Sequence, residues 1–299
     1  MTGGTTVFLA GFGGPENLDQ VPAFVESVLG RTPPEDVIPA VVHRYGLIGG
    51  GSPLPGTTRR QAALLEAELE ARGHDAKVHV GMLHAEPTIT ATADEIAAAG
   101  TDDVIVVSLA PFRCEVSTDA YEEAVVQALG GRVSSIRLAP DWNLAPRYVD
   151  ALAETLGAKL KEAPAGSPVV FAAHSLPQRM IDQGDPYASQ LLETARAVAG
   201  ELGLGAWELA YQSVSAAARE PWLGPSVEET MDRLVGSGVG SIVVDPIGFI
   251  ADHVETLYDN DVEHRAHAEV IGIDFHRCLC LNENSGLIAA LADVVEGVA

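Results

Sequence analysis

Short apolar runs alternate along the chain with amphipathic, Ala/Leu/Glu-rich stretches. The apolar runs are rich in β-branched residues and end in Gly, Pro or Ser, a pattern that predicts buried strands. The predicted strands are residues 5–10, 78–82, 103–109, 134–138, 168–173, 207–213, 241–245 and 269–273. Helical patterns cover residues 17–29, 57–72, 88–99 and 147–161. This alternation predicts βαβ units and parallel sheets, the α/β fold class.

The second half of the chain repeats the pattern of the first half. VFLAGFGGP at residues 7–15 parallels VVFAAHSLP at 169–177, and VIVVSLAPF at 104–112 parallels IVVDPIGFI at 242–250. A repeat of about 150 residues is much longer than the period of a solenoid. We therefore expect two similar Rossmann-like domains, each with a four-stranded parallel sheet flanked by helices. The expected domains are residues 1–150 and 151–299, and the last helix could pack back on the first domain.

Parallel sheets bind ligands outside the carboxyl ends of their strands. Two such domains that face each other would form an active-site cleft lined by strand-end loops. The residues at the predicted strand ends are rich in His, Glu, Tyr and Gly.

Composition and charge exclude several classes of partner. The chain is 47% hydrophobic and 20% charged, as in a globular protein, and its formal net charge is −24. Such a chain lacks the cations needed to bind nucleic acid, and an anionic membrane surface would repel it. It has no run of about 18 apolar residues that would span a membrane. Three cysteines, Cys114, Cys278 and Cys280, cannot all pair, so we expect a reducing, cytoplasmic setting.

His174 directly follows the apolar run that ends at residue 173. A histidine at the carboxyl end of a strand can act as a base near neutral pH. The alternative is a core or capping histidine whose ring bonds a backbone carbonyl.

Three carboxylates follow the strand that ends at residue 245. Glu255, Asp259 and Glu263 are spaced four residues apart, so they share one face of the predicted helix. Like charges at this spacing repel each other, and a hard divalent cation with oxygen ligands would relieve the repulsion. A solvated acidic face is the alternative, above all for Glu263, whereas Glu255 lies in the first turn.

The glycine-rich segments do not match nucleotide-binding motifs. The segment GGGSP at residues 49–53 has no following Lys-Ser/Thr and no preceding strand, so it is not a Walker loop. Residues 11–14 do not form G-x-G-x-x-G, and Ser175 is not in a G-x-S-x-G elbow.

Ten motifs in order give the chain a family resemblance. They are residues 13–15 (GGP), 44–45 (RY), 48–54 (IGGGSPL), 81–87 (GMLHAEP), 109–111 (LAP), 173–177 (AHSLP), 184–187 (GDPY), 211–213 (YQS), 221–225 (PWLGP) and 247–261 (IGFIADHVETLYDND). With these motifs the chain resembles ferrochelatase nearly from end to end. It is most similar to the short bacterial type that inserts iron into coproporphyrin.

The resemblance implies that ferrous iron enters a porphyrin, coproporphyrin III rather than protoporphyrin IX, in heme biosynthesis. His174 would then accept a pyrrole proton and contact the metal, and Glu255 would relay protons or the cation. Asp259 and Glu263 would form an outer path for the metal. By the same resemblance the substrate-binding residues would be Phe12, Arg44, Ser52, His84, Tyr121, Trp222 and Phe249. Among these, Arg44, Ser52 and Tyr121 would anchor propionates, as expected for carboxylate recognition.

The chain departs from its relatives at three places. Phe12 replaces a tyrosine of many relatives, the loop at residues 28–31 carries few arginines, and Arg113-Cys114-Glu115 replaces small polar residues. We expect a monomer with Fe²⁺ as substrate, no tightly bound cofactor, no integral membrane contact and no iron–sulfur cluster, since a cluster normally takes four thiolates. The alternatives are a chelatase for another metal or tetrapyrrole, such as cobalt, and a non-catalytic tetrapyrrole-binding protein.

Overall fold

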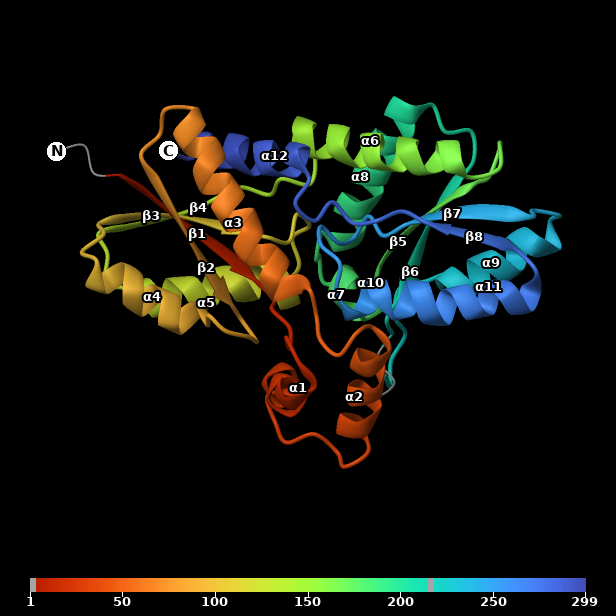
Figure 1. The fold of residues 1–299 in the computed structure, drawn as a ribbon, viewed down its shortest axis with the longest axis horizontal. Helices are drawn as coiled ribbons and strands as arrows, with labels where there is room; N and C mark the ends of the chain where they lie inside the picture. Colours follow the sequence, from red (N-terminus) through yellow and green to blue (C-terminus); the bar gives the residue numbers. More distant parts are fainter. Residues whose placement is uncertain (1–3, 215–217) are drawn as a thin grey trace. The chain divides into compact units, whose positions relative to one another are not determined.

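The computed structural model describes residues 4–214 and 218–299 and contains two compact units (Figure 1). Unit 1 comprises Met1–Ala145 and Asn282–Ala299, and unit 2 comprises Pro146–Leu281. The chain therefore leaves unit 1 at residue 145, a few residues before the sequence-based boundary at 150. It returns to unit 1 at residue 282.

Unit 1 is built around a four-stranded parallel sheet in the order β2-β1-β3-β4. Its strands are β1 (Thr5–Gly11), β2 (Ala76–Met82), β3 (Asp103–Ser108) and β4 (Ser135–Leu138). Helices α3 (Leu54–Ala71) and α12 (Ser285–Glu296) cover one face, and α4 (Ile89–Ala98) and α5 (Ala120–Leu129) cover the other (Figure 1). The predicted α/β class and parallel sheets are confirmed.

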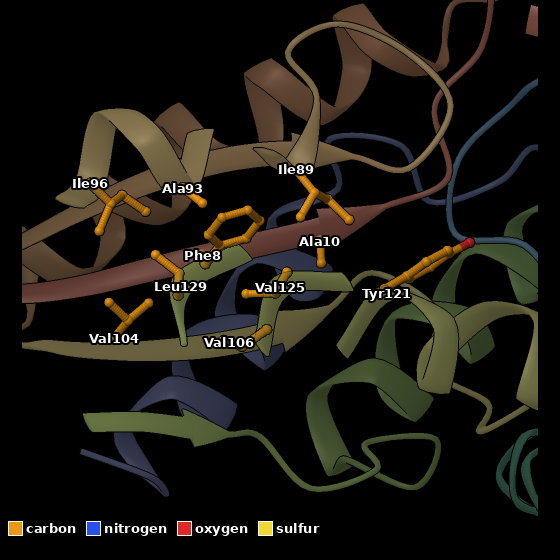
Figure 2. Packing of buried hydrophobic residues seen from close by; sticks show 10 residues of the cluster. All are labelled: Phe8, Ala10, Ile89, Ala93, Ile96, Val104, Val106, Tyr121, Val125 and Leu129. Carbon is orange, nitrogen blue, oxygen red and sulfur yellow. The ribbon is translucent and has the colours of Figure 1, made fainter. Parts of the chain in front are cut away.

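The core under α4 and α5 follows from the alternation of side chains along β1 and β3. Phe8 pairs with Val106 in the strand register, and both project into a cluster with Ile96 and Leu129 (Figure 2). Gly81 on β2 makes room for the Phe8 ring, because a Cβ there would lie 2.4 Å from Phe8 Cζ. The sheet and the two helices are thus fixed by one close-packed layer.

Two further helices of unit 1 stand apart from these layers (Figure 1). The short 3₁₀ helix η1 (Leu18–Gln20) leads into α1 (Val21–Leu29), and α2 (Val37–Leu47) follows. Phe24 of α1 and Tyr45 of α2 meet edge to face, with ring centroids 6.4 Å apart.

Unit 2 repeats the topology of unit 1, with strand order β6-β5-β7-β8. Its strands are β5 (Val169–His174), β6 (Trp207–Gln212), β7 (Ser241–Asp245) and β8 (Asp274–Arg277). Helices α6 (Pro146–Glu162) and α8 (Tyr187–Leu202) cover one face, and α9 (Val227–Gly236) and α11 (Arg265–Ile271) cover the other (Figure 1). Two shorter helices, α7 (Gln178–Asp182) and α10 (Val254–Leu257), follow β5 and β7.

One predicted strand is wrong. Residues 269–273 form the end of α11 and its cap, and the last strand is β8. Gly272 ends the helix in the left-handed conformation with φ of +75°, as glycine commonly does after a helix. Ala268 and Ile273 are buried, whereas Val270 is 85% exposed. The apolar run at 269–273 is therefore not a buried strand but the end of an amphipathic helix.

Each unit also contains a π-helical segment between its third strand and the next long helix. The segment η2 (Glu115–Asp119) precedes α5, and η3 (Asp259–His264) separates α10 from α11. Such segments are rare and often mark functional sites. Among the described residues, no helix is both long enough and apolar enough to cross a membrane.

Candidate active site

The strand order of unit 2 creates a position suited to ligand binding, as the equivalent order does in unit 1. Between β5 and β7 the chain changes the direction in which it adds strands, and ligands of open parallel sheets bind at such a point. His174 is the last residue of β5. Its carbonyl accepts a hydrogen bond from Tyr187 Oη at 3.1 Å, and its ring Nδ1 bonds the carbonyl of Ser175.

The loop after β7 lies directly against β5 because of one glycine. A Cβ at Gly248 would lie 2.7 Å from the Cβ of Ala173, and the Gly248 N–H donates to the carbonyl of Ala172 at 3.1 Å. This close approach carries the chain past the end of β5 and into α10. Glu255, in the first turn of α10, thereby reaches His174.

His174 and Glu255 form the central pair of the site. The distance from His174 Nε2 to Glu255 Oε1 is 3.5 Å, and about a third of each side chain is exposed. Burial lowers the pKa of His174, but the charge and hydrogen bond of Glu255 outweigh burial and raise it to about 9. The Trp222 ring lies beside His174, with centroids 6.4 Å apart.

His253 begins α10 as its N-cap. Its Nδ1 accepts the N–H of Glu255 at 3.1 Å, and its own N–H donates to Thr256 Oγ1 at 2.9 Å. Burial lowers the pKa of His253, against the raising effect of Glu255 and Asp252. The ring is therefore neutral and works as an acceptor, and Phe249 packs edge to face on it with centroids 4.8 Å apart.

The three carboxylates predicted to share a face have different surroundings. Asp259 is 4% exposed and accepts a hydrogen bond from Ser213 Oγ, whereas Glu263 is exposed. Ser213 has a φ of +62°, a left-handed conformation that is uncommon for serine. Within residues 4–214 and 218–299, no three His, Cys, Asp or Glu side chains are grouped as a resident metal site would require.

Arg277 ties the segment that carries Glu255 to the end of β8. Its guanidinium forms two hydrogen bonds with Asp261, at 2.8 and 2.9 Å, and a third with Asp252 at 2.9 Å. The Arg277 side chain is only 6% exposed. We call these three hydrogen bonds the Arg277 fork. The fork connects the residues before and after segment 255–259, Asp252 and Asp261, to the end of β8.

Phe12 and His84 lie together in unit 1. Their rings meet edge to face with centroids 4.7 Å apart, and Phe24 packs on Phe12 at 6.1 Å. Ser27 Oγ lies 2.9 Å from His84 Nδ1. Burial lowers the pKa of His84, so this histidine is neutral at pH 7.

The predicted propionate anchors differ in exposure. Arg44 is exposed in the last turn of α2, whereas Ser52 is 7% exposed and its Oγ accepts the N–H of Leu54. Tyr121 is 5% exposed, and its hydroxyl points away from the other side chains of the core cluster (Figure 2).

The glycine-rich segment before Ser52 has a packing role. A Cβ at Gly51 would lie 2.2 Å from the carbonyl oxygen of Glu16, and the Ser52 N–H donates to the carbonyl of Pro15 at 2.7 Å. The segment is therefore fitted against the loop after β1, in agreement with the rejection of a Walker loop.

Four side chains around Glu255 and Asp259 were given no individual role in the sequence analysis, although three of them lie within the quoted motifs. They are Gln212, Ser213, Asn260 and His264. Gln212 and Ser213 stand at a strand end, which was a usable signal. Asn260 lies in the motif at residues 247–261, whereas His264 is recognisable only through the partners that folding brings near it.

The ferrochelatase family model matches residues 4–298 of the chain. The ferrochelatase of Deinococcus radiodurans is 36% identical, over 97% of this chain and 94% of its own length. The coproporphyrin III ferrochelatase of Halalkalibacterium halodurans is 33% identical, over 95% of this chain and 94% of its own length.

A solved structure gives independent support for the fold. SirB from Bacillus subtilis, determined with Fe³⁺, superposes with a TM-score of 0.64 at 14% sequence identity, covering 99% of this chain and 96% of that one. At this identity the similarity supports the fold alone. The family match and the curated relatives cover nearly the whole chain, and they show that it belongs to the ferrochelatase family, the metal chelatases that insert iron into porphyrin in heme synthesis.

Proposed function

We propose that this ferrochelatase inserts ferrous iron into coproporphyrin III, with His174 as the acceptor of a pyrrole proton and Glu255 as the relay for protons and the cation. The observation that carries the proposal is the 3.5 Å contact between the two side chains at the carboxyl end of β5. Several relatives are named coproporphyrin III ferrochelatase, which supports the choice of porphyrin.

Metal insertion must dispose of two protons, because Fe²⁺ replaces the two pyrrole N–H hydrogens. In the free protein the His174–Glu255 pair already holds one proton, since the pKa of His174 is about 9. His174 must lose that proton before it can act as a base.

The approaching cation provides a way to release this proton. Glu255 and Asp259 are among the groups whose charge raises the pKa of His174. A divalent cation at these carboxylates would cancel their charge and lower the pKa of His174, so that its proton passes to solvent. His174 then accepts one pyrrole proton, and Glu255, released from the cation when iron enters the ring, accepts the second and passes it to solvent.

The carboxylates suit transient handling of the cation. Oxygen ligands bind hard divalent ions, and a partial ligand set both binds and releases its metal. Buried Asp259 would hold the cation near the pair, and exposed Glu263 would receive it from solvent.

The proposal assigns the porphyrin to polar anchors and aromatic walls. Arg44, Ser52 and Tyr121 would bind propionates, because guanidinium and hydroxyl groups recognise carboxylates. By the family resemblance the flat ring would contact Phe12, His84, Trp222 and Phe249, because aromatic rings pack well on one another.

An anaerobic insertion assay with wild-type protein and His174→Ala tests the proposal. We expect wild-type protein to convert coproporphyrin III faster than protoporphyrin IX. His174→Ala should bind the porphyrin with wild-type affinity but lose at least about 100-fold in kcat, the effect of removing a general base. His267→Ala, a partly exposed histidine paired with Asp232 in the same unit, is the matched control and should retain wild-type activity.

Four results would each contradict a different part of the proposal. Full activity of His174→Ala would remove the assigned base, and a preference for protoporphyrin IX would correct the substrate. Faster insertion of Co²⁺ than Fe²⁺ would favour a cobalt chelatase, whereas porphyrin binding without any insertion would favour a carrier. A monomer in the cytoplasm remains the expectation from the sequence.

A further inference from the structure

The backbone carbonyl of Glu255 is held by two side chains. Gln212 Nε2 donates to this oxygen at 2.5 Å, and Asn260 Nδ2 donates to it at 3.4 Å. Gln212 ends β6 and Asn260 lies in η3, and both are buried, with exposed fractions of 3% and 0%. The peptide group of Glu255 is therefore tied to the sheet and to the π-helical segment together.

The hydrogen bonds of Asn260 have only one consistent direction. Its Nδ2 also donates to Gln212 Oε1 at 3.2 Å, so the two oxygens that face Nδ2 are both acceptors. Asn260 Oδ1 must then face His264 Nδ1, which lies 3.3 Å away and acts as the donor.

The other ring nitrogen of His264 faces a carboxylate. His264 Nε2 lies 3.2 Å from Glu228 Oε1, a second acceptor. His264 is 2% exposed, and its ring lies between the Asn260 amide oxygen and the Glu228 carboxylate. The hydrogen bonds therefore form a series with one direction. His264 donates to Asn260, Asn260 donates to Gln212, and both amides donate to the carbonyl of Glu255.

We propose that Asn260 and Gln212 are positioning residues, which hold α10 by the Glu255 carbonyl and thereby aim the Glu255 carboxylate at His174. The buried His264 ring, which also contacts the Glu228 carboxylate, fixes the orientation of the Asn260 amide. This inference rests on the roles of His174 and Glu255 in the proposed function.

We call the two hydrogen bonds from Gln212 and Asn260 to the Glu255 carbonyl the clamp. A helix as short as α10 needs such outside hydrogen bonds to stay in place. The helix α10 has only four residues and passes directly toward η3, so its own hydrogen bonds stabilise it weakly. Aligned hydrogen bonds in a buried chain polarise and strengthen one another. Fixing the peptide group of Glu255 limits the motion of its side chain relative to His174, which is preorganisation of the pair.

Asn260→Asp tests the clamp with almost no change in shape. The aspartate has a carboxylate oxygen in place of Nδ2. This oxygen cannot donate to Gln212 Oε1 or to the carbonyl of Glu255, so both hydrogen bonds are lost. We expect kcat for iron insertion to fall by about 10- to 100-fold, as for other residues that orient a ligand, with an unchanged KM for the porphyrin. Asn260→Ala, which removes the donor without adding charge, should show the same split between kcat and KM if the aspartate variant does not fold.

The matched control is Thr194→Ala on α8 of the same unit. Thr194 is 0% exposed, so the variant also loses buried atoms and should lower Tm, but it should retain the wild-type kcat. The proposal would be overturned if Thr194→Ala and Asn260→Asp lost kcat in the same proportion to their loss in Tm. A wild-type kcat in Asn260→Asp would also overturn it.

Deuterium uptake separates this inference from the proposed function, because it needs no substrate. Asn260→Asp should accelerate exchange of the amides in residues 254–264 and leave those of α8 unchanged. If wild-type protein inserts no iron, the proposed function fails, but faster exchange in this segment would still support the clamp. Unchanged exchange would overturn the clamp even in an active enzyme.

Discussion

Glu255 determines the protonation of His174 because the two side chains are only 3.5 Å apart. The position of both residues could be predicted from a strand end and from the first turn of a helix. Their coupling could not, because it depends on the close packing of Gly248 against Ala173.

Glu255→Gln should shift the pH dependence of insertion. Wild-type kcat/KM should rise with pH toward about 9, because only deprotonated His174 can accept a proton and its pKa is about 9. The glutamine removes the main cause of that raised pKa, so the rise should move to lower pH. Anaerobic kinetics from pH 6 to 9.5 measure the shift, and Glu269→Gln on the exposed side of α11 is the control. An unmoved pH profile in Glu255→Gln would show that the pair is not coupled.

Asp245, at the end of β7, is a buried acid outside the proposed reaction. It is 3% exposed, its Oδ2 has no hydrogen-bond partner, and burial raises its pKa to about 7. An unfolded aspartate has a pKa of about 3.9. The folded state therefore binds the proton more tightly, so stability falls as pH rises from about 4 to about 7.

Asp245→Asn should remove this pH-dependent loss. Because asparagine does not ionise, the variant should be more stable than wild type at pH 8, by up to about 4 kcal/mol for a shift of about three pH units. The two proteins should differ little at pH 4. Urea unfolding at both pH values measures the difference, with exposed Asp274→Asn as the control. Equal stability of Asp245→Asn and wild type at pH 8 would mean that Asp245 is not a destabilising charge.

At the scale of elements, the strand-end loops and π-helical segments determine the site. The sequence pattern located β5, β7 and the helix after β7. It could not distinguish a regular helix from α10 followed by η3, because spacing by four residues suits both interpretations. The wrong strand at residues 269–273 has a similar cause, since a short apolar run alone does not distinguish a strand from a helix end.

The hydrogen bonds of buried Arg277 should stabilise unit 2 more than the exposed ion pair between Arg265 and Asp261 does. Arg277→Met leaves Asp252 and Asp261 without their buried cation, and we expect a loss of about 3–5 kcal/mol in the free energy of unfolding. Arg265→Met removes an exposed partner of Asp261 and should cost less than about 1 kcal/mol. Urea denaturation compares the two variants. Equal losses would show that burial of the fork adds nothing.

At the scale of the whole molecule, the internal repeat predicted two four-stranded parallel sheets, whereas the order of the strands in each sheet is seen only in the structure. The sequence analysis allowed the last helix to pack back on the first domain, but the repeat itself does not specify this placement. That depends on contacts that form in unit 1 between α3 and α12. Arg72, next to the end of α3, bonds Asp293 at 2.7 Å and Glu296 at 2.8 Å, and Arg72 Nη2 reaches the carbonyl of Ala289 at 3.3 Å.

Arg72→Ala should loosen α12 from unit 1. The side chain is 20% exposed and has three carboxylate partners, so we expect a loss of about 2–3 kcal/mol, between the values for exposed and buried pairs. Deuterium uptake of residues 285–296 should increase while uptake in β5 stays constant. Arg59→Ala, which removes an exposed pair with Glu16, is the control. Unchanged protection of α12 would show that apolar packing alone holds it.

The return of α12 to unit 1 has a consequence for synthesis on the ribosome. Residues 146–281 are contiguous and emerge before α12, so unit 2 can fold while the α3 face of unit 1 still lacks its covering helix. A nascent chain from which residues 285–296 have not yet emerged would therefore expose apolar surface of unit 1, and that surface is where a chaperone would bind.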